Sequence, residues 1–208
     1  MMKRFTVVLK IWLLVFAACA VAAALCFKKV DVPVALHVWG AGRHFGAVNA
    51  AFGATVILTL EAAVVLALVL ARLTRGHLSR LGEALGVACI ASICAYGVND
   101  QVFKPFFGVS SPLAVVHGAR HDFHLAMGTA ASSFPSGHMV LAGAFAGAFM
   151  RLYPPSTRVL TGLLLLAAAL LVAGDWHFVS DVIMGAFVGV SAGMLAGEGW
   201  LVHISLRP

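Results

Sequence analysis

Six long runs of apolar residues constrain the fold of this 208-residue chain more than any other feature. They cover residues 5–27, 47–71, 85–102, 137–153, 159–174 and 179–204. Each run is near the roughly 17–25 residues that a helix needs to cross a bilayer. A backbone in lipid must satisfy its own hydrogen bonds, and a long apolar segment does so as an α-helix. The runs therefore predict an all-α, polytopic membrane bundle of about six transmembrane helices.

Charged residues make up only 11% of the chain and lie mostly between the apolar runs, whereas soluble proteins carry about 25%. The net charge of +6 does not indicate a nucleic-acid partner, because basic residues beside membrane spans set topology. We do not find the short alternating segments of a β-barrel. The four cysteines lie within apolar runs and lack zinc-type spacing, so we expect neither a disulfide nor a metal.

The first run has an alternative interpretation, because Lys3 and Arg4 precede it as they would precede a cleaved signal peptide. The run is long for a signal peptide, and the Ala-Leu-Cys sequence near its end is a poor cleavage site. We therefore expect a retained helix. No internal repeat or low-complexity linker divides the chain, so residues 1–208 are expected to form a single transmembrane domain.

The basic residues between the runs predict the orientation of the helices. With the N-terminus inside, the cytoplasmic segments hold Lys3, Arg4, Arg72, Arg75, Arg80, Arg151, Arg158 and Arg207. The outer segments hold Lys28, Lys29, Arg43, Lys104 and Arg120. This cytoplasmic excess predicts that both termini are inside. The long loop 103–135 and the short junction 175–181 are then expected outside, where their polar residues converge on one face of the membrane.

The segment Pro135-Ser136-Gly137-His138 precedes a long apolar run and is typical of a helix start. Free backbone N–H groups and the positive end of the helix dipole make such a start an anion site. Ser136 adds a hydroxyl donor, and Gly137 lets a phosphate approach the backbone closely. His138 could give a proton to a leaving group. An ordinary helix cap with an interfacial histidine explains this tetrapeptide equally well.

His177 and Asp181 are four residues apart, so they would share one face of a helix. The carboxylate would fix the imidazole tautomer and raise its basicity, leaving the other nitrogen free to attack. A salt-bridged pair at the membrane surface is the alternative. The topology favours an active site, because two helix crossings return the chain from His138 to His177. The residues expected to share one outer site are Lys104, Ser136, Gly137, His138, His177 and Asp181.

These segments resemble the motifs of the PAP2 family, the type 2 phosphatidic acid phosphatases related to vanadium haloperoxidases. The family pattern is Lys-x6-Arg-Pro, then Pro-Ser-Gly-His, then Ser-Arg-x5-His-x3-Asp. The chain matches at Lys104 and Pro112, throughout 135–138, and at His177 and Asp181.

The resemblance covers roughly residues 85–200 and implies a PAP2-like catalytic core. It makes His177 the nucleophile that forms a phosphohistidine, with Asp181 orienting it. It makes His138 the acid that protonates the leaving alcohol. The residues implied to hold the phosphoryl oxygens are Lys104, Ser136 and Gly137. No metal or cofactor is required, because cationic and backbone donors stabilise the charge. The flanking residues resemble bacterial members, which implies a multi-pass protein of the cytoplasmic (inner) membrane with its site facing the periplasm.

The chain departs from the family pattern at its arginines. Ser111 and Leu171 stand where the pattern has arginine, and Val109 stands where related members often carry another. Arginine binds phosphoryl oxygens bidentately, so its loss should weaken phosphate binding. Arg120, in the outer loop, could compensate. The same loop holds His117, His121 and His124. A solvated or headgroup-facing surface is the favoured interpretation of these loop residues.

The sequence thus predicts a lipid phosphatase that acts on a lipid phosphate or pyrophosphate. A lipid phosphotransferase that uses the same phosphohistidine is a close variant. The alternative is a non-catalytic or degenerate PAP2-like protein that binds or moves phospholipid headgroups. The replaced arginines favour this binder, whereas the retained His-His-Asp set favours the enzyme. Either protein would act in lipid metabolism, with membrane lipid as its partner.

Overall fold

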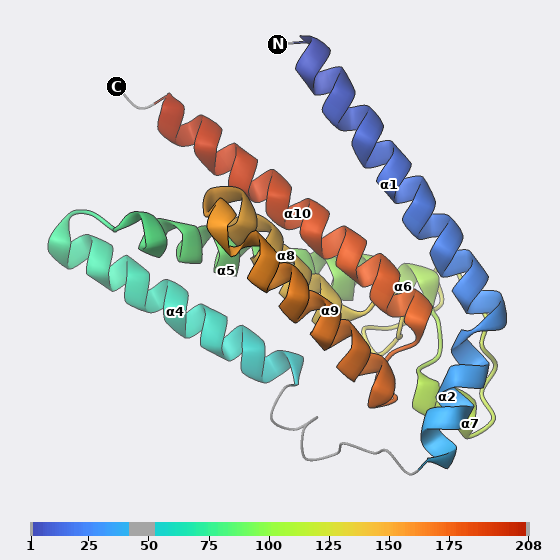
Figure 1. Ribbon diagram of the computed structural model, residues 1–208. Coiled ribbons are helices and arrows are strands. Elements are labelled where there is room, and N and C mark those ends of the chain that lie inside the picture. The colour runs from blue at the N-terminus through green and yellow to red at the C-terminus, as the bar shows by residue number, and fades with distance from the viewer. Residues whose placement is uncertain (1, 42–52, 207–208) are drawn as a thin grey trace.

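A computed structural model describes residues 2–41 and 53–206, and its regular structure there is entirely helical. The long helices are α1 (Met2–Lys29), α4 (Ala54–Arg75), α5 (Arg80–Val98), α8 (Gly137–Leu152), α9 (Thr157–Ala173) and α10 (Val179–Ser205). The short ones are α2 (Asp31–Gly40), α6 (Lys104–Phe107) and α7 (Pro112–Val116), with a π-helical turn at Asn99–Phe103 and a 3-10 turn at Pro154–Ser156. The start of α1 and the end of α10 lie at the same end of the bundle (Figure 1).

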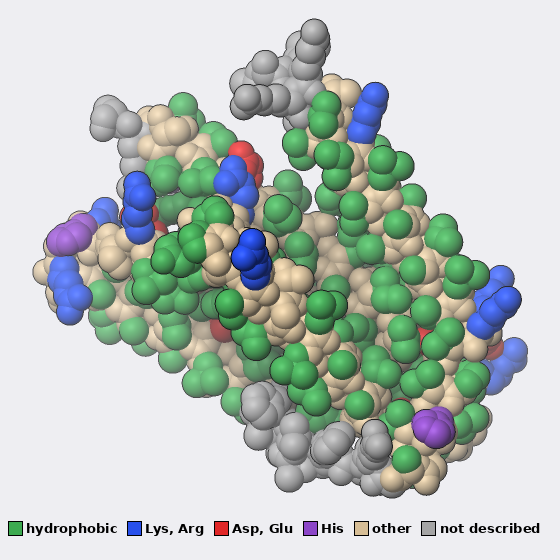
Figure 2. Space-filling model, in the orientation of Figure 1, with side chains coloured by type: hydrophobic (Ala, Val, Ile, Leu, Met, Phe, Trp, Pro, Cys, Tyr) green, Lys and Arg blue, Asp and Glu red, His purple; other side chains and the backbone are tan. Residues whose placement is uncertain are grey.

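Five helical stretches of the described chain are long and apolar enough to cross a membrane. They are Thr6–Lys29, Ala54–Arg75, Arg80–Val116, Pro154–Ala173 and Val179–Ser205. Helix α8 is also apolar but has only 16 residues. Hydrophobic side chains cover most of the visible face, and the basic ones lie toward the two ends (Figure 2). The predicted polytopic helical membrane bundle is confirmed. Helix α8, which is shorter than the other five, corresponds to the fourth predicted run.

The predicted runs and the observed helices differ mainly in the first half of the chain. The predicted start of the second run, residues 47–52, lies outside the described residues, as do Arg43 and Arg207. The sequence did not predict α2, which occupies part of the first outer segment. An aspartate at its first position and a proline two residues later suit the first turn of a helix.

Helix α8 packs directly against both α5 and α10. Its contact with α10 is close because glycines recur every four residues along α10. A Cβ atom at Gly193 would lie only 2.1 Å from the carbonyl oxygen of Ala144, and one at Gly189 only 2.5 Å from that of Val140. The two backbones therefore touch, and the first turns of α8 and α10 lie side by side.

A buried apolar cluster of Met139, Leu171 and Val182 joins these first turns to the end of α9. Each residue comes from a different helix, α8, α9 and α10 respectively. Packing among three helices fixes the short connection 174–178 between α9 and α10. That connection carries His177.

Candidate active site

The two motif histidines face each other where α8 and α10 begin. His138 lies in the first turn of α8, and His177 immediately precedes the N-cap residue of α10. Nδ1 of His138 lies 3.4 Å from Nε2 of His177, and the ring centroids are 5.6 Å apart. The two crossings between these histidines therefore return the chain to one site.

Asp181 and Ser133 bind the opposite edge of the His177 ring. The Asp181 side chain is fully buried, and its Oδ2 lies 3.5 Å from Nδ1 of His177. The hydroxyl of Ser133 donates to the same oxygen, and its Oγ lies 3.4 Å from Nδ1. A carboxylate at Nδ1 favours the tautomer with the proton on that nitrogen. Nε2 is then the unprotonated nitrogen, on the side of His138.

His177 and Asp181 were expected to share one face of a helix. Their contact has a different origin. Helix α10 starts at Val179, so His177 lies outside it. Asp181 is at the third helical position, where its Oδ2 accepts the backbone N–H of Phe178 at 2.9 Å. The carboxylate thus caps its own helix and contacts the histidine just before the cap. The Ser133 contact was not predicted, because it joins two residues that are 48 positions apart in the chain.

Ser136 and Gly137 form the start of α8, as predicted. The Ser136 Oγ accepts the backbone N–H of Met139 at 3.3 Å, which is an N-cap. The Ser136 N–H donates to the carbonyl oxygen of Asp181 at 3.1 Å, so the two helix starts are bonded to each other. A serine hydroxyl can accept and donate at once. The cap geometry is therefore compatible with donation to a bound phosphate.

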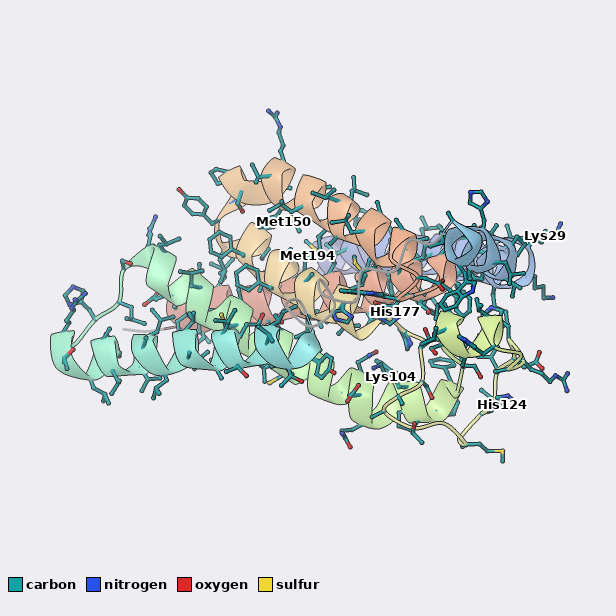
Figure 3. All side chains as sticks on the ribbon, turned by 90° about the horizontal axis from the view of Figure 1, so that it is seen from below. Lys29, Lys104, His124, Met150, His177 and Met194 are labelled. Atoms are coloured by element: carbon teal, nitrogen blue, oxygen red, sulfur yellow. The ribbon has the colours of Figure 1, made fainter. Side chains whose placement is uncertain are left out.

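Lys104 reaches this helix start from the end of the π-helical turn after α5. A Cβ atom at Gly137 would lie 3.5 Å from the Lys104 Nζ and 2.9 Å from the ring of Tyr96. Lys104 is buried, donates to the carbonyl oxygen of Ala130 at 3.0 Å, and pairs with Asp100 at 2.9 Å. Lys104 and His177 lie in the same region of the molecule (Figure 3). Asp100 partly neutralises the charge of Lys104. The sequence analysis did not name this aspartate, although its position four residues before Lys104 is typical of an ion pair within a helix.

The positions of the replaced arginines have structural roles. Leu171 is buried in the apolar cluster with Met139 and Val182. Its carbonyl oxygen accepts the backbone N–H groups of Trp176 at 3.0 Å and His177 at 3.3 Å. Position 171 therefore supports His177 through packing and backbone bonds rather than through charge.

Ser111 replaces the other motif arginine and caps α7, its Oγ accepting the N–H of Ala114 at 3.3 Å. Val109 is fully buried, and its carbonyl oxygen accepts the N–H of Ser133 at 2.8 Å. Both positions thus support the loop 103–135, and Val109 fixes the backbone of Ser133, which contacts Asp181.

The basic residues of the loop 103–135 that the sequence analysis singled out, apart from Lys104, are not gathered at the histidine pair. The Arg120 side chain is 84% exposed and pairs with Asp122 at 2.9 Å, so the structure does not place it with Lys104 as a compensating cation. His117 and His124 are exposed, as expected for a solvated loop. The solvated-surface expectation is wrong for His121, whose side chain is only 7% exposed.

Fold and site together define a helical membrane protein with a facing pair of histidines backed by a buried carboxylate. The model of the PAP2 superfamily matches residues 82–198, more than half of the chain. The chain belongs to the PAP2 superfamily, which confirms the resemblance inferred from the motifs. No curated protein and no solved structure matches the chain. The matched span runs from α5 to α10 and leaves out α1, α2 and α4.

Proposed function

We propose that this protein is a phosphatase of lipid phosphates or lipid pyrophosphates that acts through a phosphohistidine on His177. PAP2 membership supports the phosphatase class. The observation that carries the proposal is the buried contact of Asp181 with Nδ1 of His177, at 3.5 Å, which leaves Nε2 facing His138. Such an arrangement prepares an imidazole for nucleophilic attack.

In the first step, Nε2 of His177 attacks phosphorus while the bond from phosphorus to the leaving alkoxide breaks. Protonated His138 gives its proton to the leaving oxygen, and Asp181 stabilises the positive charge that develops on His177. In the second step, neutral His138 takes a proton from water. The water oxygen attacks the phosphohistidine, and phosphate leaves with the N–P bond electrons returning to Nε2.

Lys104 and the first-turn N–H groups of α8 would stabilise the phosphoryl oxygens. Their proximity is supported by the 3.5 Å distance from Nζ to the Cβ position of Gly137. Asp100 lowers the net positive charge of this group, and the buried Leu171 adds none. This weak cationic field favours the second candidate function, a degenerate member that binds or moves phospholipid headgroups without hydrolysis. A phosphotransferase would share the first step and replace water with an alcohol.

An apolar cavity of about 600 Å³ supports a substrate with a lipid tail. Its lining includes Phe16 of α1, Phe187 of α10, and the loop residues Phe134 and Pro135. The last two immediately precede Ser136 at the start of α8. A hydrocarbon chain in this cavity would have its phosphate end near that helix start. We further propose that the site faces the periplasm of a bacterial inner membrane, with both termini cytoplasmic.

Lipid phosphates are expected to be hydrolysed at least about tenfold more efficiently than soluble sugar phosphates. Each CH₂ group removed from water contributes about 0.8 kcal/mol, and only a lipid chain can occupy the apolar cavity. The measurement is kcat/KM for phosphate release by purified protein in detergent. The substrates are phosphatidate, a prenyl phosphate, a prenyl pyrophosphate and glucose 6-phosphate. Equal values for the lipid and sugar substrates would contradict the lipid assignment, and lipid binding without any release would support the binder.

Lys104→Ala is expected to lower turnover of the best lipid substrate about a hundredfold, the typical cost of removing one transition-state donor. Arg120→Ala should stay within about twofold of wild type, because its side chain is exposed and pairs with Asp122. The two variants form a matched pair of cation deletions in one assay. Equal losses would show that Arg120 reaches the bound phosphate.

A further inference from the structure

A second buried carboxylate, Asp31, lies beside the candidate site and belongs to a helix outside the family match. It is the first residue of α2 and is only 1% exposed. Its Oδ1 accepts the backbone N–H of Ser180 at 3.1 Å, and its Oδ2 accepts the Ser180 hydroxyl. Its Oδ2 also lies 3.3 Å from Nε2 of His121. One carboxylate thus joins α2, the outer loop and the first turn of α10.

The ring of His121 contacts two aromatic side chains. Its centroid lies 4.1 Å from that of Phe27 and 4.2 Å from that of Phe178. Phe178 is the N-cap residue of α10, and its N–H donates to Asp181. The imidazole therefore holds the residue next to His177, in addition to contacting Asp31.

Asp31 hydrogen-bonds to Ser180, and His121 contacts Phe178. These two residues are the chain neighbours of the candidate catalytic pair. Phe178 follows His177 in the chain, and Ser180 precedes Asp181. Burying a carboxylate is costly unless it is paired and hydrogen-bonded. Here its partners belong to the segment that sets the distance between the imidazole and its carboxylate.

We propose that Asp31 is a positioning residue for His177, acting through Ser180 and, by way of His121, through Phe178. The inference rests on the proposed function of His177. In Asp31→Asn an amide NH₂ replaces one carboxylate oxygen, so the side chain accepts from only one of the two Ser180 donors. The other donor is left unpaired in a buried place, which is costly, and a shift of the Ser180 backbone that relieves this cost would also move the adjacent Asp181. The segment before residue 82 therefore contributes to the active site.

The kinetic test compares Asp31→Asn, Ser180→Ala and the double variant with wild type, using the best lipid substrate. Asp31→Asn should lower kcat about tenfold to a hundredfold, the range seen when the group that orients a metal-bound histidine is removed, with KM within about twofold. Ser180→Ala should change kcat in the same direction. The double variant should be no slower than Asp31→Asn alone, because both changes remove one contact. Asp122→Asn, an exposed carboxylate in the same loop, is the control and should match wild type.

A second readout does not depend on activity. In histidine-labelled protein in micelles, the ¹⁵N signals of His177 are identified by their loss in His177→Ala. Wild type should hold the neutral ring mainly with its proton on Nδ1, and Asp31→Asn should show a mixture of tautomers. The tautomer of His177 can be compared even if the wild-type protein hydrolyses no substrate. A failure of the proposed function is therefore distinguished from a failure of this inference.

Wild-type kcat and an unchanged His177 tautomer in folded Asp31→Asn would overturn the inference. The inference would also be overturned if the lower activity of Asp31→Asn were fully explained by the fraction of the protein that is unfolded. Should Asp31→Asn not fold, Ser180→Ala decides instead, because it keeps the buried pair of Asp31 with His121. A wild-type tautomer signal in folded Ser180→Ala would then overturn the inference, and a mixed signal would support it.

Discussion

Replacing His177 with alanine is expected to lower phosphate release by at least about a thousandfold. Removing a nucleophile eliminates the covalent route and leaves only binding and charge stabilisation. The fold should persist, because the ring is held by side-chain contacts to Ser133, Asp181 and His138, while the backbone at 177 is bonded to Leu171. The measurement is single-turnover release from phosphatidate, with trapping of an acid-labile phosphoenzyme from labelled substrate.

The matched control for this variant is His124→Ala, which removes an exposed histidine from the loop 103–135. It should retain wild-type turnover and the labelled phosphoenzyme. Phosphatase activity that survives His177→Ala would remove the proposed mechanism. A phosphoenzyme that forms on another residue of that variant would lead to the same conclusion.

Gly193→Ala is expected to destabilise the bundle by about 3 kcal/mol or more, at the upper end of typical overpacking costs. The added Cβ would lie 2.1 Å from the carbonyl oxygen of Ala144 and 2.7 Å from the backbone nitrogen of Ala148. These are backbone atoms of α8, which cannot rotate away, so the two helices must separate. Separation would also move the start of α8 away from the start of α10.

Gly199→Ala is the matched control, because it lies on the same helix and its added Cβ would meet nothing within 4 Å. Alanine favours helix over glycine by up to about 1 kcal/mol, so this variant should be as stable as wild type or slightly more so. Equilibrium unfolding in mixed micelles compares the two variants. Equal stability of Gly193→Ala and Gly199→Ala would contradict the close backbone contact between α8 and α10.

The apolar runs predicted four of the long helices, α1, α8, α9 and α10, to within three residues, because membrane spans depend on local hydrophobicity and length alone. The short helix α2 was missed because its ten residues are too few to cross a membrane and carry little periodic signal. The end of the third run was also misjudged. Helix α5 passes into a π-helical turn at Asn99–Phe103, and the local sequence does not reveal that change of hydrogen bonding.

The motif residues could be named from the sequence because their spacing matches the number of membrane crossings between them. His138 and His177 are the clearest case, since two helices, α8 and α9, separate them in the chain. Asp181 could be named as the partner of His177, but the other polar residues around the site could not. Ser133 and Asp31 each meet the site through contacts between residues far apart in the chain, 149 positions in the case of Asp31 and Ser180.

The sequence by itself determined the membrane class, the helical spans and the superfamily, since these depend on local composition and on motif spacing. Only the tertiary structure decided which polar side chains surround the histidines. Arg120 and His121 are adjacent in the chain, yet one is 84% exposed and the other is buried against Asp31. Loop residues carry no periodic pattern that distinguishes inside from outside. Their burial is set by which distant helices pack beneath them, here α1, α2 and α10.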